Sequence, residues 1–145
     1  MLRGTLEYNI RLMRFSDYKD AISLWKSLPG MGLSGADEPE EIHKFLKFNP
    51  NTCFVALFKN KLAGTILGGS DGRRGYIYHL AVRGDLQKMG VGRALLNRCL
   101  DAFRDAGLQK THIFVIADNS QGVAFWEKMG WVKRDDILAM SKDLL

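Results

Sequence analysis

The feature that most constrains the fold is a strand-like segment that runs into a glycine-containing loop and then into a long amphipathic helix. Residues 76–82 are mostly apolar or aromatic, which is typical of a buried strand. From Gly90, apolar residues recur at helical spacing as far as Ala106. The start of a long helix must therefore follow closely on the end of a strand, which predicts a layered α/β domain.

The other elements follow from the same two periodicities. Strands are predicted at 8–14, 52–58, 62–68, 110–117, 131–134 and 137–142, and further helices at 16–28, 39–48 and 120–129. This order, β-α-α-β-β-β-α-β-α-β-β, predicts a mixed, largely antiparallel sheet with helices on both faces. No linker or repeat interrupts it, so residues 1–145 are expected to form one domain.

The loop before the long helix has the composition of an anion-binding site. A helix N-terminus exposes unpaired N–H groups and the positive end of the helix dipole, and both attract phosphate. Gly90 and Gly92 lack a Cβ, so a pyrophosphate can approach the backbone, and Gln87, Lys88 and Arg93 add side-chain donors. The spacing fits neither the P-loop nor GxGxxG. The alternative interpretation is a glycine-rich turn without a ligand.

Two blocks of sequence resemble one known family. Gln87, Gly90 and Gly92 match the pyrophosphate pattern of the GNAT superfamily of N-acetyltransferases, in which Arg or Gln is followed three residues later by Gly and then by Gly or Ala. The segment 119–131 is similar to the family signature N-x-x-A-x-x-F-Y-x-K-x-G-F, with Gly122 where alanine is usual. The resemblance extends in element order from about Ile10 to Leu144.

The resemblance implies a GNAT fold, in which the fourth and fifth strands splay apart and admit the pantetheine arm of acetyl-CoA. It implies acetyl-CoA as co-substrate, no metal, and acetyl transfer to a primary amine of a small molecule or peptide by direct attack in a ternary complex. Asn119 would bind pantetheine, cap a helix, or do both. The implied CoA-binding residues are Leu80, Ala81, Val82, Gln87, Lys88, Met89, Gly90, Val91, Gly92, Arg93, Asn119, Phe125 and Trp126.

One position departs from the family pattern. The family usually has tyrosine after Phe125, thought to protonate the departing thiolate, and this chain has Trp126. An indole N–H donates a hydrogen bond but is not an acid at working pH, so the usual acid is absent or relocated. Trp126 then packs against the pantetheine. The departure leaves open an alternative function, an acyl-CoA-binding module with little or no transferase activity.

The predicted fourth strand carries the candidate catalytic residues. Because side chains alternate along a strand, Tyr76, Tyr78 and Leu80 are expected on one face and His79 on the other. Basic residues of related acetyltransferases lie two and four positions before the Leu80 site, which favours Tyr78 and Tyr76 over His79 as the catalytic base. A β-bulge would reverse this parity. For His79, catalysis and hydrogen bonding in the core both stay open.

An acidic cluster lies around the start of the second predicted helix. It consists of Asp37, Glu38, Glu40 and Glu41. These carboxylates either attract a cationic amine or stabilise the first turn of the helix, and we favour the second interpretation.

Charge and composition exclude several other classes. The net charge is +5, but the basic residues are scattered along the chain, so no nucleic-acid partner is expected. No apolar run reaches the roughly 18 residues of a membrane span, and the N-terminus lacks a signal-peptide core. We therefore expect no membrane partner and a cytoplasmic location. Cys53 and Cys99 are expected to be buried, reduced thiols. A monomer and a homodimer are equally compatible with the sequence.

Overall fold

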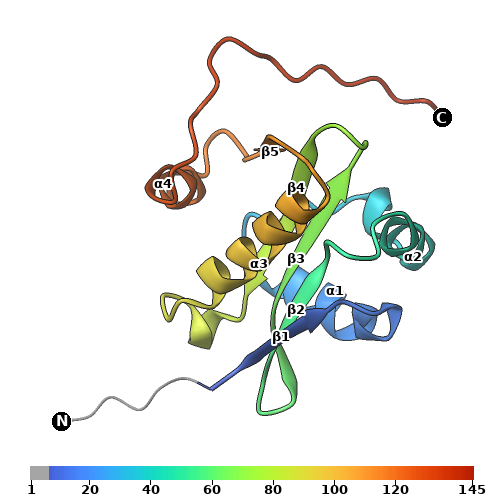
Figure 1. The fold of residues 1–145 in the computed structure, drawn as a ribbon, viewed down its shortest axis with the longest axis vertical. Helices are drawn as coiled ribbons and strands as arrows, with labels where there is room; N and C mark the ends of the chain where they lie inside the picture. The colour runs from blue at the N-terminus through green and yellow to red at the C-terminus, as the bar shows by residue number, and fades with distance from the viewer. Residues whose placement is uncertain (1–6) are drawn as a thin grey trace. The chain divides into compact units, whose positions relative to one another are not determined.

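The computed structural model describes residues 7–145, which form two compact units, one ending at Phe114 and one spanning Val115–Leu145. The first unit holds a five-stranded sheet in the order β1-β2-β3-β4-β5 (Figure 1). All neighbours are antiparallel except β4 and β5, which are parallel, as predicted for a mixed sheet. The strands are β1 Asn9–Leu12, β2 Phe54–Phe58, β3 Lys61–Ser70, β4 Gly75–Val82 and β5 Thr111–Ile113.

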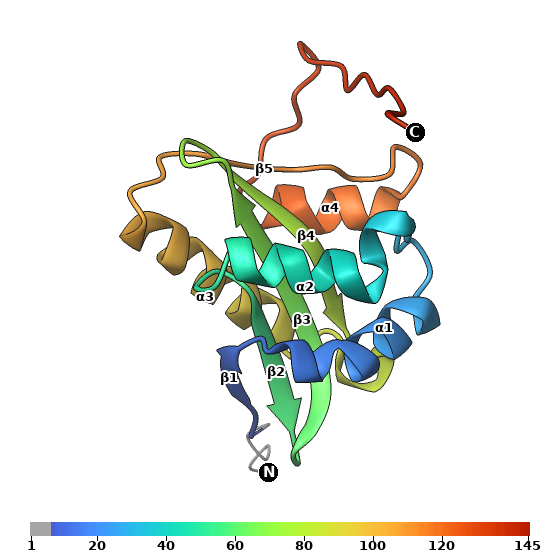
Figure 2. The same ribbon diagram turned by 90° about the vertical axis from the view of Figure 1, so that its right-hand side faces the viewer.

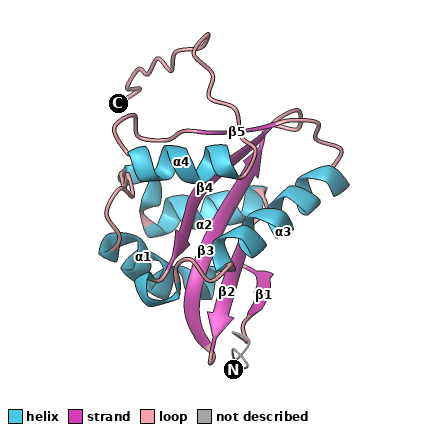
Figure 3. Cartoon of the chain, turned by 90° about the vertical axis from the view of Figure 1, so that its left-hand side faces the viewer, coloured by secondary structure: helices cyan, strands magenta, loops and turns pink. Residues whose placement is uncertain are grey.

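Helices of the first unit cover both faces of this sheet. Two of them, α1 and α2, lie on one face (Figure 2), and α3 lies on the other (Figure 3). The second unit contributes α4. The helices are α1 Tyr18–Ser27, α2 Pro39–Phe48, α3 Val91–Asp105 and α4 Ser120–Lys128, with short 3₁₀ turns η1 Phe15–Asp17, η2 Gly35–Asp37 and η3 Gly84–Leu86.

Apolar side chains fill the space between the sheet and each layer of helices. On the α1 face, Trp25 is fully buried, and its indole N–H donates to Thr65 Oγ1 at 2.9 Å. On the α3 face, the helix approaches so closely that a Cβ at Gly68 would lie 2.6 Å from Cys99 Sγ. The absence of a side chain at Gly68 therefore allows α3 to pack on β3.

Both cysteines are buried and neither forms a disulfide. The thiol of Cys53 donates to Gly68 O and that of Cys99 to Thr52 O, each at 3.4 Å. Burial raises the pKa of each thiol to about 12. The predicted buried, reduced thiols are thus confirmed.

The edge between β4 and β5 opens partway along β4. The two strands pair only from Gly75 opposite Thr111 to Ile77 opposite Ile113. Beyond Ile77, β4 continues to Val82 with no strand on that side among residues 7–145. The predicted splay of the fourth and fifth strands is confirmed.

The two strands predicted at 131–134 and 137–142 are wrong for the described chain, which has no strand in 131–145. A strand needs the backbone groups of a neighbouring strand, and the second unit offers only α4. Charged side chains of the segment pair locally instead, as Arg134 does with Asp136 at 2.9 Å. Among residues 7–145, no helix is long and apolar enough to cross a membrane.

Candidate functional site

A β-bulge in β4 sets the geometry of the site. Tyr78 pairs with Leu67 and Ala81 with Thr65, so His79 and Leu80 together lie opposite the single residue between them on β3. His79 takes the left-handed conformation, with φ of +48°, which is rare for a residue inside a strand. The bulge puts Ala81 in the core cluster of the α1 face, so alternation turns Leu80 to the other face. The prediction that Leu80 shares a face with Tyr76 and Tyr78 is therefore wrong.

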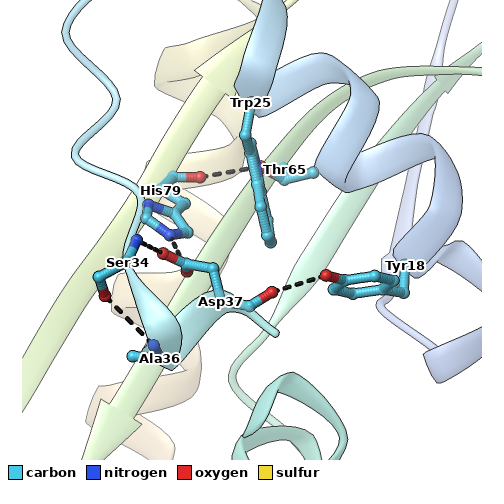
Figure 4. A network of polar contacts seen from close by, with 7 residues as sticks. All are labelled: Tyr18, Trp25, Ser34, Ala36, Asp37, Thr65 and His79. Carbon is cyan, nitrogen blue, oxygen red and sulfur yellow. Dashed lines mark hydrogen bonds and ion pairs between the residues drawn. The ribbon is translucent and has the colours of Figure 1, made fainter. Parts of the chain in front are cut away.

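The bulge directs the imidazole of His79 toward the carboxylate of Asp37 in η2 (Figure 4). The Nε2–Oδ1 distance is 2.6 Å, and both side chains are largely buried. The Ser34 N–H donates to the second carboxylate oxygen at 2.9 Å, and the Tyr18 hydroxyl donates to Asp37 O at 2.6 Å. Three hydrogen bonds thus hold Asp37 in place.

Contacts with α1 and β3 fix the other side of His79. Its ring centroid lies 4.5 Å from that of Trp25, and its carbonyl oxygen accepts from Thr65 Oγ1 at 2.8 Å. The ionised Asp37 only accepts, so in the neutral ring Nε2 carries the hydrogen and Nδ1 carries the lone pair. Nδ1 has no partner among residues 7–145 and is not sealed from solvent. The arrangement is that of a general base oriented by a carboxylate.

The pairing of Asp37 with His79 could not be found from sequence. The two residues are 42 positions apart, and the acidic cluster resembled the first turn of a helix. Asp37 does close a capping box with Ser34 in η2, but its carboxylate also bonds His79. The only sequence signals were the acidic cluster and the possibility of a bulge at His79.

Tyr78 lies next to His79 but suits a different role. Burial, together with a smaller effect of nearby Tyr76, raises the pKa of Tyr78 above its usual value of 10.0. Its hydroxyl therefore stays protonated near neutral pH and acts as a donor, not as a base. Its ring packs edge-on against Phe45 of α2, with 5.9 Å between the ring centroids, whereas the ring of Tyr76 packs against His112.

Tyr78 and His79 line one cavity of about 500 Å³ between β4, β3, η2 and α2. Asp37 lies in the same wall. A molecule in this cavity would therefore meet both His79 and Tyr78, and of the two only His79 has the proton-accepting geometry.

The loop after β4 ends in an open helix N-terminus. Gly90, with φ of +90°, is the N-cap of α3 and has no side chain to cap it. The first bond of the helix runs from the Ala94 N–H to Gly90 O, so the N–H groups of Val91, Gly92 and Arg93 lack intrahelical acceptors. The first turn contains no acidic residue. Three such N–H groups at a helix N-terminus are suited to bind an anion.

The side chains of this loop have distinct positions. Gln87 donates to Val82 O at 2.9 Å and so braces the loop against the end of β4. Lys88, Met89 and Arg93 are exposed, and Val91 is buried. The exposed cations near the open N–H groups are therefore Lys88 and Arg93.

Within the second unit, Asn119 and Trp126 have local structural roles. Asn119 caps α4 by accepting from the Gly122 N–H at 3.0 Å. Trp126 lies between Phe125 and Trp131, with ring centroids 5.3 Å and 4.8 Å away. The CoA contacts of these residues stay predictions from the sequence. Over the described residues 7–145, no group of three or more His, Cys, Asp or Glu is placed to hold a metal ion.

Comparison with known proteins gives consistent matches along the sequence. Residues 19–131 match the model of the Acetyltransferase (GNAT) family. The chain is 31% identical over 137 residues to the protein named Acetyltransferase SG1711 of Sodalis glossinidius (strain morsitans). That match covers 94% of this chain and 95% of the relative.

Solved structures share the fold. The PaiA N-acetyltransferase of Thermoplasma acidophilum, in complex with coenzyme A, has a TM-score of 0.74 at 16% identity, over 85% of this chain and 88% of that one. An aminoglycoside acetyltransferase from an uncultured soil metagenomic sample, in complex with sisomicin, has a TM-score of 0.73 at 19% identity, over 95% and 97%. At these identities the likeness is one of fold.

Proposed function

Because the chain belongs to the GNAT family of acetyltransferases, we propose that it transfers the acetyl group of acetyl-CoA to a primary amine of a small molecule or peptide. The amine attacks the thioester directly while both substrates are bound. The observation that carries this proposal is the open N-terminus of α3 beside the unpaired edge of β4.

The residues at the start of α3 fit a pyrophosphate. The unpaired N–H groups of Val91, Gly92 and Arg93 supply donors, and the dipole of the helix favours negative charge. Gly92 faces open space: a Cβ there would meet only Val82 Cγ2, at 3.5 Å. A phosphate group can therefore approach the backbone without steric conflict.

The unpaired edge of β4 fits an extended amide-containing arm. Between Tyr78 and Val82 no strand of the described residues pairs with β4 on the β5 side, so apart from Val82 O, which accepts from Gln87, the outward backbone groups are not taken up by another strand. Pantetheine carries two amides and binds to such an edge as an added strand does. Its thioester then lies close to the bulge and to His79.

His79 and Asp37 supply the base of the proposed reaction. An alkyl amine is largely protonated at neutral pH, so the attacking nitrogen must lose a proton. His79 Nδ1 accepts that proton directly or through water, and the Asp37 carboxylate stabilises the resulting imidazolium. The Tyr78 hydroxyl, which stays protonated, is a candidate donor to the departing thiolate. This assignment replaces the preference for Tyr78 and Tyr76 as the base.

Incubation of the purified protein with acetyl-CoA and a panel of primary amines tests the proposal. We expect an N-acetylated product, identified by mass spectrometry, in a one-to-one ratio with released CoA thiol. Calorimetric titration with CoA alone should show one binding site. Absence of CoA binding would contradict the proposed function whatever the amine.

A further inference from the structure

The cavity beside His79 has walls that restrict the kind of amine it can hold. Its volume of about 500 Å³ suits a small molecule. Its lining includes His79, which would take up the proton, and Asp37, which holds His79. The rest is largely apolar, with side chains contributed by α2, β3 and β4: Ile42, Phe45, Phe48, Leu67 and Tyr78.

Aromatic rings dominate the apolar wall. Phe45 and Tyr78 meet edge-on, and Tyr78 is 38% exposed. Phe48 is 78% exposed although it is an apolar residue at the end of a well-formed helix. An apolar ligand body placed against these rings would remove their surface from water, which is favourable.

The charged side chains that line the cavity form two pairs, one largely buried and one half-exposed. Asp37 holds His79 at 2.6 Å, and Glu41 pairs with Lys44 at 3.0 Å. Asp37 and Glu41 are the only carboxylates among the lining residues. The wall therefore offers no unpaired carboxylate to a second ammonium group, and burying an unpaired ammonium is costly.

We propose that the acceptor is a monoamine whose single primary amino group is carried on an aromatic or branched aliphatic body. This inference rests on the proposed function, because it assigns the substrate class of the same site. The body lies against Phe45, Phe48 and Tyr78, and the nitrogen lies next to His79. The reacting nitrogen forms its bond to the acetyl carbon, and the nitrogen's proton passes to His79. The carbon–sulfur bond breaks with its electron pair on sulfur, so that CoA leaves as the thiolate.

Comparison of kcat/KM across a panel of amines tests whether hydrophobic monoamines are preferred to polyamines and peptides. The panel contains phenethylamine and isoamylamine as hydrophobic monoamines, spermidine and kanamycin as polycations, and a short peptide with N-terminal phenylalanine. We expect kcat/KM for phenethylamine to exceed the values for spermidine and kanamycin by at least about tenfold. A higher value for the peptide than for phenethylamine would support the aromatic wall and identify the amine as a peptide N-terminus.

A pair of matched variants tests the wall itself. Phe48→Ala should raise KM for phenethylamine by about tenfold, because the ligand body loses apolar contact, and should leave the Kd of CoA unchanged. Leu12→Ala is the control: Leu12 is also an exposed apolar residue, but it lies in β1 and does not line the cavity. KM in Leu12→Ala should equal that of the unaltered protein.

The outcomes distinguish failure of the inference from failure of the proposed function. If CoA binds and spermidine or kanamycin is the better substrate, or if another amine is acetylated and no hydrophobic monoamine is, the inference is wrong and the family activity stands. The same holds if Phe48→Ala leaves KM unchanged. If CoA binds and no amine in the panel is acetylated, the proposed transfer itself is wrong and the chain is an acyl-CoA-binding module. If neither CoA binding nor acetylation of any amine is found, the proposed function itself is wrong.

Discussion

At the scale of single residues, the backbone conformation of His79 directs its imidazole toward Asp37. A positive φ at a non-glycine residue costs on the order of 1 kcal/mol, and such residues are common at functional sites. Here the Thr65 hydroxyl holds the carbonyl of His79 and the Asp37 carboxylate holds its ring. The backbone conformation is thus stabilised from two elements that are distant in sequence.

If His79 is the base, His79→Gln should lower kcat by about a hundredfold and abolish the acidic limb of the pH–rate profile. Asp37→Asn should lower kcat less, by about tenfold, and retain that limb, because the imidazole is still present. Tyr78→Phe should have the smallest effect at neutral pH, since its hydroxyl does not accept the proton. Steady-state kinetics over a pH range, with CoA affinity measured in parallel, checks all three. A larger loss of kcat in Tyr78→Phe than in His79→Gln would indicate that Tyr78, and not His79, is the base.

At the scale of elements, the start of α3 is held open by its own sequence. Gly90 supplies the left-handed N-cap, Gln87 bonds the loop to Val82, and no side chain of residues 7–145 forms a cap hydrogen bond to the first turn. These features are local in sequence, which is why an open helix start could be expected from the glycine-containing loop before a long helix. That a pyrophosphate binds there stays a prediction. The bulge in β4 depends on contacts with η2 and α1, and for that reason it could only be named as a possibility.

Gly92→Val should weaken CoA binding by at least about tenfold, because the branched side chain would occupy the space of a phosphate. The Cβ of the new side chain would lie 3.5 Å from Val82 Cγ2, an ordinary van der Waals contact, so the fold should persist. Calorimetry gives the affinity and circular dichroism the fold. Gly84→Val is the matched control, since a Cβ at Gly84 meets nothing within 4 Å and the site lies outside α3. Equal affinities in both variants would count against the phosphate site.

The ion pair that joins β1 to η1 predicts a pH-dependent contribution to stability. Partial burial acts to raise the pKa of Asp17, but hydrogen bonds from the Arg11 guanidinium and the Arg14 N–H outweigh it and lower this pKa below its ordinary 3.8. Because the pKa of Asp17 is lower in the folded state, the ion pair stabilises the fold at pH values above the unfolded-state pKa. This stabilisation is lost as the pH falls through the folded-state pKa.

Asp17→Asn should therefore lower the free energy of unfolding by about 1 kcal/mol at pH 7, and by less as pH falls below about 4. Urea unfolding at both pH values measures the difference. Asp101→Asn, which breaks an exposed pair with Arg104, should change little at either pH. A loss in Asp17→Asn that does not depend on pH would show that the pair contributes through packing alone.

At the scale of the whole molecule, the order of elements from β1 to α4 was predictable and the structure of the C-terminal segment 131–145 was not. Helix α2 has the predicted bounds because Pro39 suits its first turn and Asn49–Pro50 ends it. The strands from β2 to β4 followed from alternation and from the hairpin at Lys59–Asn60. The segment 131–145 was misassigned because an alternating pattern does not reveal whether a partner strand exists. The pairing of His79 with Asp37 was missed for a related reason, since the two residues lie 42 positions apart in sequence.

CoA should stabilise the entire folded chain, since a ligand that binds only the folded state adds its binding free energy to the stability. At a CoA concentration about a hundred times Kd the gain is about 2.7 kcal/mol. For a chain of this size the midpoint of thermal unfolding should rise by roughly 5–10 °C. Differential scanning fluorimetry measures the shift. A midpoint that does not move at saturating CoA would mean that CoA does not bind the native protein.

The deep burial of Cys53 and Cys99 has a practical consequence for enzymology. Disulfide reagents react with thiolates, and a pKa of about 12 leaves almost none at neutral pH, while burial blocks access to both sulfur atoms. The thiols of the native protein should therefore not react with a chromogenic disulfide. In an assay of released CoA thiol, each equivalent of colour then reports one turnover. The assay needs no cysteine-free variant, in which the loss of two buried side chains would weaken the packing of the core.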